Sequence, residues 1–371
     1  MADTPHLTAG DASHLERARV LARAGWGHVH PNPMVGCVLV RDGEVIGEGW
    51  HREFGGPHAE VVALEAARGR AGGATAYVSL EPCNHHGKTP PCAEALARAG
   101  IRRVVFGATD PGAESGGGAH TMRTAGVEVV GPVWDTRTAR AENPVFHHTA
   151  THASPWVALK LAQTLDGKIA ERPGVQTRIT GAEAERRVHE LRTGFDALLV
   201  GAGTSRVDDP LLTVRLASPG RLAPARMVLD PPAEMPSRAA VLRDARTVPV
   251  HVFTRHDARE GELERLEGTG AHVHPVAYDR QGLSLEAVLS VAWGLGIRSI
   301  LCEGGARLSA ALLRERVVRR IYLFISPIAF GEEGVAAFSG VQRDVWQRFR
   351  LAFPPEVLGQ DTLLVLDREE D

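Results

Sequence analysis

Residues 76–108 read AYVSLEPCNHHGKTPPCAEALARAGIRRVVFGA, and the architecture of the first part of the chain can be inferred from them. The short apolar run 76–80 predicts a strand, the helical spacing of 92–99 ends at Gly100, and 104–108 predicts another strand. Strands that alternate with helices indicate a layered α/β domain. In this arrangement Pro82-Cys83 follows a strand and Cys92 begins a helix.

The residues before this stretch add a helix, a hairpin and a second helix to the same domain. Ser13 and Glu16 predict a capping box, followed by apolar residues at helical spacing that stop at Gly25. Asp42-Gly43 separates the apolar runs 35–40 and 45–50, which predicts a tight hairpin. Residues 58–67 again have helical spacing.

A change of pattern at residues 143–155 predicts an irregular linker, because the segment loses periodicity and contains Asn143-Pro144 and Ser154-Pro155. We therefore expect one domain over 1–150 and another over 151–371. The second is also predicted to be α/β, with no internal repeat shared with the first. Its expected strands are 157–161, 197–200, 227–229, 250–253, 300–303 and 321–325, and its expected helices are about 181–192, 285–294 and 307–313.

The composition of the 371 residues, with 43% apolar and 23% charged, is that of a soluble globular protein. Forty-two basic against 45 acidic residues give a net charge of −3, which favours neither nucleic acid nor a membrane as partner. The first residues do not have the pattern of a signal peptide and no apolar run approaches about 18 residues, so we expect neither a signal peptide nor a membrane span. Since four cysteines in so long a chain argue against a disulfide framework, we expect a cytoplasmic protein.

His58, Glu60, Cys83 and Cys92 form the strongest chemical signal in the sequence. One imidazole and two thiolates suit a catalytic zinc with its fourth position open to water. Glu60 would then be the general acid/base, as in the signature of nucleobase deaminases. Three other interpretations stay open: surface residues, inert core cysteines, or a structural zinc closed by His85 or His86.

Three segments of the second half follow strands and contain glycines or charged residues: Lys160–Lys168, Gly201–Pro210 and Glu303–Ala306. A glycine-rich turn before a helix can bind phosphate on its backbone N–H groups. It can equally be a tight connection, and the dinucleotide fingerprint Gly-x-Gly-x-x-Gly is not found.

The segments 30–36 (HPNPMVG), 57–60 (PHAE) and 81–92 resemble the deaminase half of the bifunctional riboflavin-biosynthesis deaminase/reductase family. The resemblance implies a cytidine-deaminase-like, three-layer fold with zinc on His58, Cys83 and Cys92 and with Asn32 facing the pyrimidine. It also implies hydrolytic deamination of a diaminopyrimidinone that carries a phosphoribosylamino group. The glycine-rich loop 112–119 departs from the family pattern.

The segments 160–168, 201–215 and 303–306 are similar to the reductase half of that family. This similarity implies a dihydrofolate-reductase-like fold, reduction of the ribosyl to a ribityl chain by NADPH, and a homo-oligomer, since these halves commonly pair. The implied NADPH contacts are Ala162, Arg178, Thr204, Asp208, Gly305, Ala306, Arg307 and Leu308, and the implied substrate contacts are Gln176, Arg192, Leu212, Arg215 and Glu303. The guanidinium groups of Arg192 and Arg215 suit the substrate phosphate.

Two rivals to this interpretation remain at the level of sequence. One is a nucleotide or tRNA-base deaminase with an unrelated C-terminal domain, for which a basic groove is expected. The other is a non-catalytic protein with a structural zinc, for which a fourth protein ligand is expected.

Overall fold

The computed structural model describes residues 7–85, 90–216, 220, 222–280 and 282–369. Its contacts divide the chain into two compact units, Met1–Thr151 and His152–Asp371, each of which is described by itself. Within the described residues, no helix combines the length and the apolar character needed to cross a bilayer.

A mixed five-stranded sheet forms the centre of the first unit, in the order β2-β1-β3-β4-β5. Strand β1 pairs antiparallel with β2 and β3, whereas β3, β4 and β5 run parallel. The strands are β1 (Gly36–Arg41), β2 (Glu44–Trp50), β3 (Thr75–Leu80), β4 (Arg103–Ala108) and β5 (Glu128–Val130).

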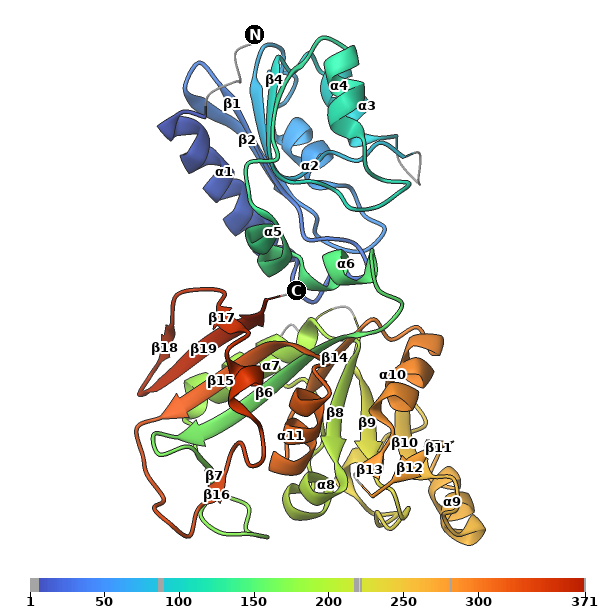
Figure 1. Cartoon of the computed structure of the whole chain (residues 1–371). Helices are drawn as coiled ribbons and strands as arrows, with labels where there is room; N and C mark the ends of the chain where they lie inside the picture. The colour runs from blue at the N-terminus through green and yellow to red at the C-terminus, as the bar shows by residue number, and fades with distance from the viewer. Residues whose placement is uncertain (1–6, 86–89, 217–219, 221, 281, 370–371) are drawn as a thin grey trace. The chain divides into compact units, whose positions relative to one another are not determined.

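Helices cover both faces of this sheet, which makes three layers (Figure 1). Because side chains alternate along a strand, Cys37 and Leu39 of β1 pack with α2, α3 and α4, while Val38 and Val40 pack with α1. The helices are α1 (Ala9–Ala22), the short 3-10 helix η1 (Arg23–Gly25), α2 (Ala59–Ala66), α3 (Cys92–Arg98), α4 (Gly118–Thr124), α5 (Thr136–Glu142) and α6 (Pro144–Thr149).

Glycines of β1 and β2 let helices lie directly against strand backbone, and Gly36 and Gly49 are two examples. A Cβ added at Gly36 would lie 2.0 Å from the carbonyl oxygen of Ala18 in α1. A Cβ added at Gly49 would lie 2.4 Å from the carbonyl oxygen of Ala59 in α2. Glycine is therefore required at both positions, and backbone contact fixes where α2 begins relative to β2.

The N-terminus of α1 differs from its prediction. The helix begins after Thr8, whose side chain accepts a hydrogen bond from the Asp11 N–H, while the Asp11 carboxylate accepts one from the Thr8 N–H. Asp11 also accepts hydrogen bonds from the Tyr77 hydroxyl at 2.8 Å and from Arg103 at 2.7 Å. The expected start at Ser13 was wrong because these partners from β3 and β4 select the earlier capping box.

The second unit contains a ten-stranded sheet in the order β11-β10-β9-β8-β14-β6-β15-β19-β17, with β18 also paired to β19 (Figure 1). All strands from β11 to β15 in this order run parallel, and β19, β17 and β18 add antiparallel pairs. The strands are β6 (Trp156–Thr164), β8 (Ala197–Gly201), β9 (Ala225–Leu229), β10 (Val250–Arg255), β11 (His272–Val276), β14 (Ser299–Cys302), β15 (Val318–Ser326), β17 (Phe349–Leu351), β18 (Glu356–Leu358) and β19 (Asp361–Arg368).

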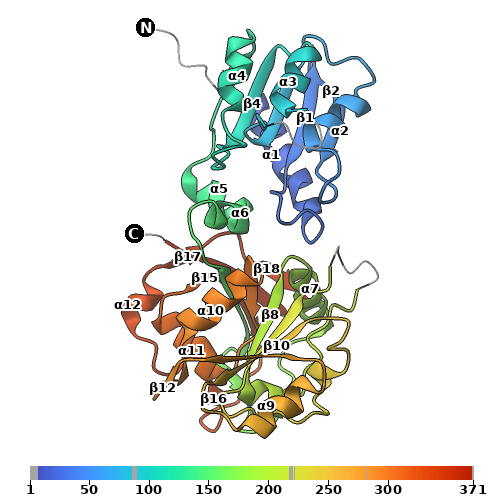
Figure 2. The same ribbon diagram turned by 90° about the vertical axis from the view of Figure 1, so that its right-hand side faces the viewer.

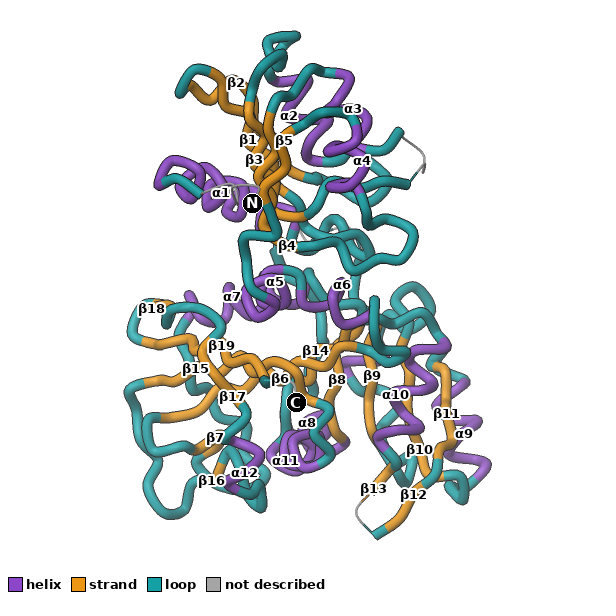
Figure 3. The backbone as a smooth tube through the Cα atoms, turned by 45° about the horizontal axis from the view of Figure 1, so that its top comes forward, coloured by secondary structure: helices purple, strands orange, loops and turns teal. Residues whose placement is uncertain are grey.

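The core of this unit lies between one face of the sheet and helices α10 and α11. Figure 2 and Figure 3 show where these two helices lie beside the sheet. Val288 and Leu312 from these helices pack with Leu159 and Ile300. The helices are α7 (Ala182–Thr193), α8 (Ala202–Asp208), the 3-10 helix η2 (Ala240–Leu242), α9 (Glu260–Glu267), α10 (Leu285–Gly294), α11 (Ala306–Arg314) and α12 (Arg343–Trp346). Two small sheets pair β7 (Lys168–Ala170) with β16 (Val335–Ala336) and β12 (Tyr278–Asp279) with β13 (Gly282–Leu283).

The segment 143–155 is only partly irregular. Helix α6 occupies Pro144–Thr149 and has proline in its first turn. The expectation of a wholly irregular linker was wrong here because a proline at the first helical position loses no hydrogen bond and presets the backbone angle of a helix.

Candidate functional site

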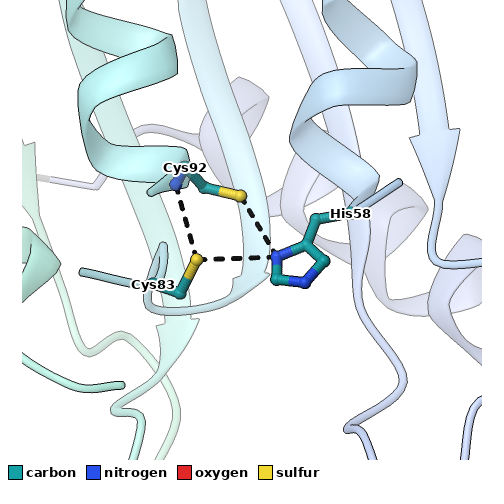
Figure 4. A group of neighbouring side chains, drawn as sticks. All are labelled: His58, Cys83 and Cys92. Atoms are coloured by element: carbon teal, nitrogen blue, oxygen red, sulfur yellow. Dashed lines mark hydrogen bonds between the residues drawn. The ribbon is translucent and has the colours of Figure 1, made fainter. Parts of the chain in front are cut away.

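Three donor side chains meet in the first unit: His58 immediately before α2, Cys83 shortly after β3, and Cys92 at the start of α3. His58 Nδ1 lies 3.5 Å from Cys83 Sγ and 3.3 Å from Cys92 Sγ (Figure 4). The three ligand atoms lie within 4.8 Å of one another, and no other such group of three occurs among the described residues.

The donor set fits zinc. Tetrahedral zinc has bonds of about 2.0 Å to nitrogen and about 2.3 Å to sulfur, which put a nitrogen and a sulfur ligand roughly 3.5 Å apart. The observed separations of 3.3 and 3.5 Å match this value. His85 is not a member of the group, and His86 lies outside the described residues.

The thiol of Cys83 is chemically suited to hold a cation, whereas the hydrogen bond with Cys83 and burial raise the pKa of the Cys92 thiol. Hydrogen bonds with Cys92 and His58 outweigh the effect of burial and lower the pKa of the Cys83 thiol to about 4. The backbone N–H of Cys92 also donates to Cys83 Sγ at 3.4 Å. Thiolate, rather than thiol, is the form that binds metal.

Glu60 lies in the first turn of α2, two residues after His58, and only 3% of its surface is exposed. Burial, together with the negative charge of Cys83, raises the pKa of Glu60 to about 7, although His58 opposes the change. A carboxyl group that gains and loses its proton near neutral pH suits general acid/base catalysis.

Asn32 is connected to the same region by His51, a residue that the sequence analysis did not single out. Its Nδ2 is 3.1 Å from Nε2 of His51, and Nδ1 of His51 is 3.0 Å from the carbonyl oxygen of Pro57. The rings of His51 and His58 are 5.3 Å apart, centre to centre. His51 lies beyond the end of β2, where the sequence pattern alone does not distinguish it from a surface histidine.

The glycine-rich loop 112–119 is attached to the segment that carries Cys83. The buried Glu81 carboxylate accepts the N–H of Asp110 at 3.3 Å with one oxygen and that of Ala119 at 3.0 Å with the other. The Asn84 N–H donates to the Ser115 carbonyl at 2.9 Å. Glu81 was also missed, because its partners are 29 and 38 residues away in sequence.

A second cluster lies in the second unit, where α7 meets the end of β14. Arg192 donates to Glu303 through Nε at 2.5 Å and Nη2 at 2.8 Å, and through Nη1 to the Thr213 carbonyl at 2.6 Å. Burial lowers the pKa of Lys160, and the negative charge of Glu303 opposes this change. Burial also raises the pKa of Asp208, and the positive charge of Lys160 opposes that change. Two predicted substrate residues, Arg192 and Glu303, are thus brought into direct contact.

Two side chains of α7, those of His189 and Glu185, connect further predicted residues to this cluster. His189 Nδ1 is 3.4 Å from Arg192 Nη1 and accepts the N–H of Arg215 at 3.3 Å. Glu185 pairs with Arg215 at 3.4 Å and with Arg178 at 2.9 Å. The guanidinium of Arg215 is largely exposed, unlike that of Arg192.

The remaining predicted residues lie around the starts of α8 and α11. A Cβ added at Gly305 would lie 2.8 Å from Thr204 Oγ1, so the two segments are in contact, and Gly305 has a φ of +73°. Gln176 Nε2 donates to the Asp208 carbonyl at 3.4 Å. Ala162 lies on β6, Leu212 is buried in the loop after α8, and Ala306, Arg307 and Leu308 form the first turn of α11.

Both units match known protein families. Residues 155–364 match the RibD C-terminal domain, and residues 10–108 match the cytidine and deoxycytidylate deaminase zinc-binding region. The riboflavin biosynthesis protein RibD of Aquifex aeolicus is 41% identical over 323 residues, which are 87% of this chain and 88% of that protein. The chain belongs to the RibD family.

Other members of the RibD family agree over nearly the whole length. RibD of Escherichia coli is 36% identical and covers 90% of this chain and 92% of its own. The structure of Acinetobacter baumannii RibD has a TM-score of 0.80 at 34% identity, covering 97% of this chain and 99% of that one. A diaminohydroxyphosphoribosylaminopyrimidine deaminase/5-amino-6-(5-phosphoribosylamino)uracil reductase from Thermotoga maritima has a TM-score of 0.80 at 36% identity, with the same coverage.

Membership of the RibD family confirms the fold class and the general function predicted from the sequence. The protein has an N-terminal cytidine-deaminase-like domain and a C-terminal RibD reductase domain, and it is a bifunctional deaminase and reductase of riboflavin biosynthesis. The alternative of a base deaminase with an unrelated C-terminal domain is not supported, since residues 155–364 match the RibD domain itself.

Proposed function

We propose that the first unit deaminates a diaminopyrimidinone carrying a phosphoribosylamino group and that the second unit then reduces its ribosyl to a ribityl chain with NADPH. The observation that carries the proposal is the convergence of His58, Cys83 and Cys92 at zinc-compatible distances, with the buried Glu60 beside them. The Thermotoga maritima relative, at 36% identity, is named for both of these reactions.

In the first unit His58, Cys83 and Cys92 would hold zinc, which when bound makes water a stronger nucleophile at neutral pH. Glu60 accepts a proton from the attacking water and delivers it to the departing amino nitrogen. The water oxygen forms a bond to a ring carbon, and the bond from that carbon to its exocyclic amino nitrogen breaks. One water proton leaves with that nitrogen as ammonia, and the other stays on the product, whose ring carbon becomes a carbonyl. Asn32 holds the pyrimidine through its side-chain amide.

In the second unit the contacting segments around Thr204 and Gly305 fit a nicotinamide cofactor, because α11 begins directly after Gly305 and the first N–H groups of a helix bind phosphate. NADPH when bound supplies the hydride. Its proposed contacts are Ala162, Arg178, Thr204, Asp208, Gly305, Ala306, Arg307 and Leu308.

The substrate of the second unit is proposed to bind between Glu303, Gln176, Leu212 and Arg215. Each guanidinium nitrogen of Arg192 donates to Glu303 or Thr213, so we propose that Arg192 holds the Glu303 carboxylate in place for the ribose hydroxyls. Arg215 has the exposed guanidinium and is the better partner for the phosphate.

We further propose that the protein acts in the cytoplasm as a homo-oligomer. Size-exclusion chromatography with light scattering tests the assembly, and a mass equal to that of one chain would contradict it.

A coupled assay on the purified, zinc-quantified protein tests the reactions. Ammonia release and NADPH oxidation are followed separately on the diaminopyrimidinone substrate, and we expect NADPH oxidation to require prior deamination. Ammonia release without NADPH oxidation would contradict the proposed reduction. The absence of both signals from a zinc-loaded protein would contradict both proposed reactions.

A further inference from the structure

One face of helix α7 holds the loop that follows α8. His189 and Arg192 are three residues apart on α7, and residues with this spacing are neighbours on a helix surface. Arg192 Nη1 donates to the Thr213 carbonyl at 2.6 Å. His189 Nδ1 accepts the backbone N–H of Arg215 at 3.3 Å. Two hydrogen bonds from one helix thus fix both ends of the segment 213–215.

The backbone adopts an unfavourable conformation just before this segment. Leu212 has a φ of +48°, in the left-handed region that residues other than glycine rarely occupy. Its side chain is buried, with 2% exposed. Such a conformation persists only where the surrounding structure holds it. The hydrogen bonds from α7 therefore help to determine where the residues after Leu212 lie, and Arg215 is among them.

The donors around the His189 ring determine which of its nitrogens carries hydrogen. Backbone and guanidinium N–H groups only donate, and Nδ1 lies 3.3 Å from the nitrogen of Arg215 and 3.4 Å from Nη1 of Arg192. Nδ1 must therefore carry a lone pair. Burial and the positive charges of Arg192 and Arg215 lower the pKa of His189. The negative charges of Glu303 and Glu185 offset this only in part, so the ring is neutral at pH 7, with its hydrogen on Nε2.

We propose that His189 is a positioning residue of the reductase site, which holds the backbone at Arg215 so that the exposed guanidinium is in place for the phosphate group of the substrate. This rests on the proposed reduction in the second unit, in which Arg215 binds that phosphate. Glu185 pairs with the same guanidinium at 3.4 Å, so α7 holds both the backbone and the side chain of Arg215. A group that is ordered before its ligand arrives loses less conformational freedom on binding.

The first test is a ¹⁵N NMR measurement of the histidine rings in the full-length protein at neutral pH, with the His189 ring assigned through its bonds to the backbone. The chemical shifts separate protonated from unprotonated ring nitrogens. We expect hydrogen on Nε2 only. Hydrogen on Nδ1 would overturn the proposal, because that nitrogen could not then accept from Arg215.

The second test compares two variants of similar shape in the reductase assay. The oxygen of asparagine reaches the place of Nδ1, so His189→Asn should raise KM for the deaminated substrate by less than about threefold. Leucine has no acceptor, so His189→Leu should raise this KM about tenfold or more and change kcat and the KM for NADPH by less than about twofold. Equal values of KM in the two folded variants would overturn the proposal.

The third test asks whether His189 acts on the phosphate through Arg215. Calorimetry measures the binding of the deaminated substrate and of the same compound without its phosphate. We expect His189→Leu to weaken the binding of the phosphorylated compound about tenfold and that of the other less than about twofold. Added to Arg215→Ala, His189→Leu should weaken binding by less than about a further twofold, because both act on one contact. Equal losses for the two compounds, or losses that multiply in the double variant, would overturn the proposal.

Circular dichroism and ammonia release by the first unit serve as controls for all variants. If both His189 variants fail to fold, the NMR result on the unmodified protein still decides the proposal. If the unmodified protein binds the deaminated substrate but oxidises no NADPH with it, the proposed reduction fails, whereas calorimetry still decides the role of His189.

Discussion

Replacing Arg192 by alanine removes the partner of a buried carboxylate. The side chains of Arg192 and Glu303 are 11% and 8% exposed and are joined by two hydrogen bonds. Breaking such a pair from one side costs about 3–5 kcal/mol, because the remaining charge is buried without compensation. Since Lys160 also attracts Glu303, we expect Arg192→Ala to lower the free energy of unfolding of the second unit by about 3 kcal/mol at pH 7.

The pH dependence of this loss follows from the pKa of Glu303. Burial raises that pKa, but the charge and hydrogen bonds of Arg192 outweigh burial, so it lies below its usual value. The pair therefore stabilises the folded protein above the unfolded-state pKa of about 4.3 and loses this effect as the pH falls through the lower folded-state pKa. The difference between the two proteins should be largest at neutral pH and should shrink on acidification.

Hydrogen exchange across a urea series, read by mass spectrometry, measures the loss for amides of β6 and β14 separately from those of the first unit. The matched control is Arg187→Ala on the same helix, whose pair with Glu356 is 29% and 45% exposed and should contribute less than about 1 kcal/mol. If Arg192→Ala costs no more than this control, or if its cost does not change with pH, the reasoning is refuted. Deamination should be unaffected in both variants.

Four further outcomes are expected. Glu60→Gln should abolish ammonia release while zinc stays stoichiometric by atomic absorption, and loss of zinc would contradict its assignment as a non-ligand. Arg215→Ala should raise KM in the reductase assay at least tenfold and leave deamination unchanged, because the exposed guanidinium that is proposed to bind the phosphate is lost. An equal decrease of both activities would contradict the assignment of Arg215 to the reductase site. Gly49→Ala should lower the free energy of unfolding of the first unit by about 1–3 kcal/mol and weaken zinc retention under chelator, whereas the control Gly72→Ala, which meets nothing within 4 Å, should do neither. Burial lowers the pKa of His251 to about 4, so folding loses stability as the pH falls below about 6.5; His251→Phe should flatten that loss in acid unfolding curves, and an unchanged slope would count against it.

The convergence of His58, Cys83 and Cys92, the proposed zinc ligands, could be predicted from the sequence because each residue is tied to a local pattern. His58 and Cys92 begin segments with helical spacing, and Pro82-Cys83 ends an apolar run. Strands that lie side by side in one sheet bring such element ends together, so local patterns were sufficient. The alternation of strands and helices in the second half likewise indicated an α/β unit.

Contacts between residues far apart in the chain could not be predicted in this way. Arg192 and Glu303 are separated by 111 residues, and nothing local distinguishes Arg192 from a surface arginine of its helix. The capping box at Thr8 was missed because Asp11 is held by Tyr77 and Arg103, which are 66 and 92 residues away. Such polar links depend on tertiary geometry, which sequence periodicity does not contain.

The contact of Gly49 with the backbone of α2 has a consequence for how this deaminase can change. Where two elements touch through main-chain atoms, the distance between them no longer depends on the volume of the side chains around them. Core residues near β2 can then be exchanged, by evolution or by an engineer, without moving His58. The requirement for glycine at position 49 thus helps to keep His58, a proposed zinc ligand, in place while the surrounding sequence changes.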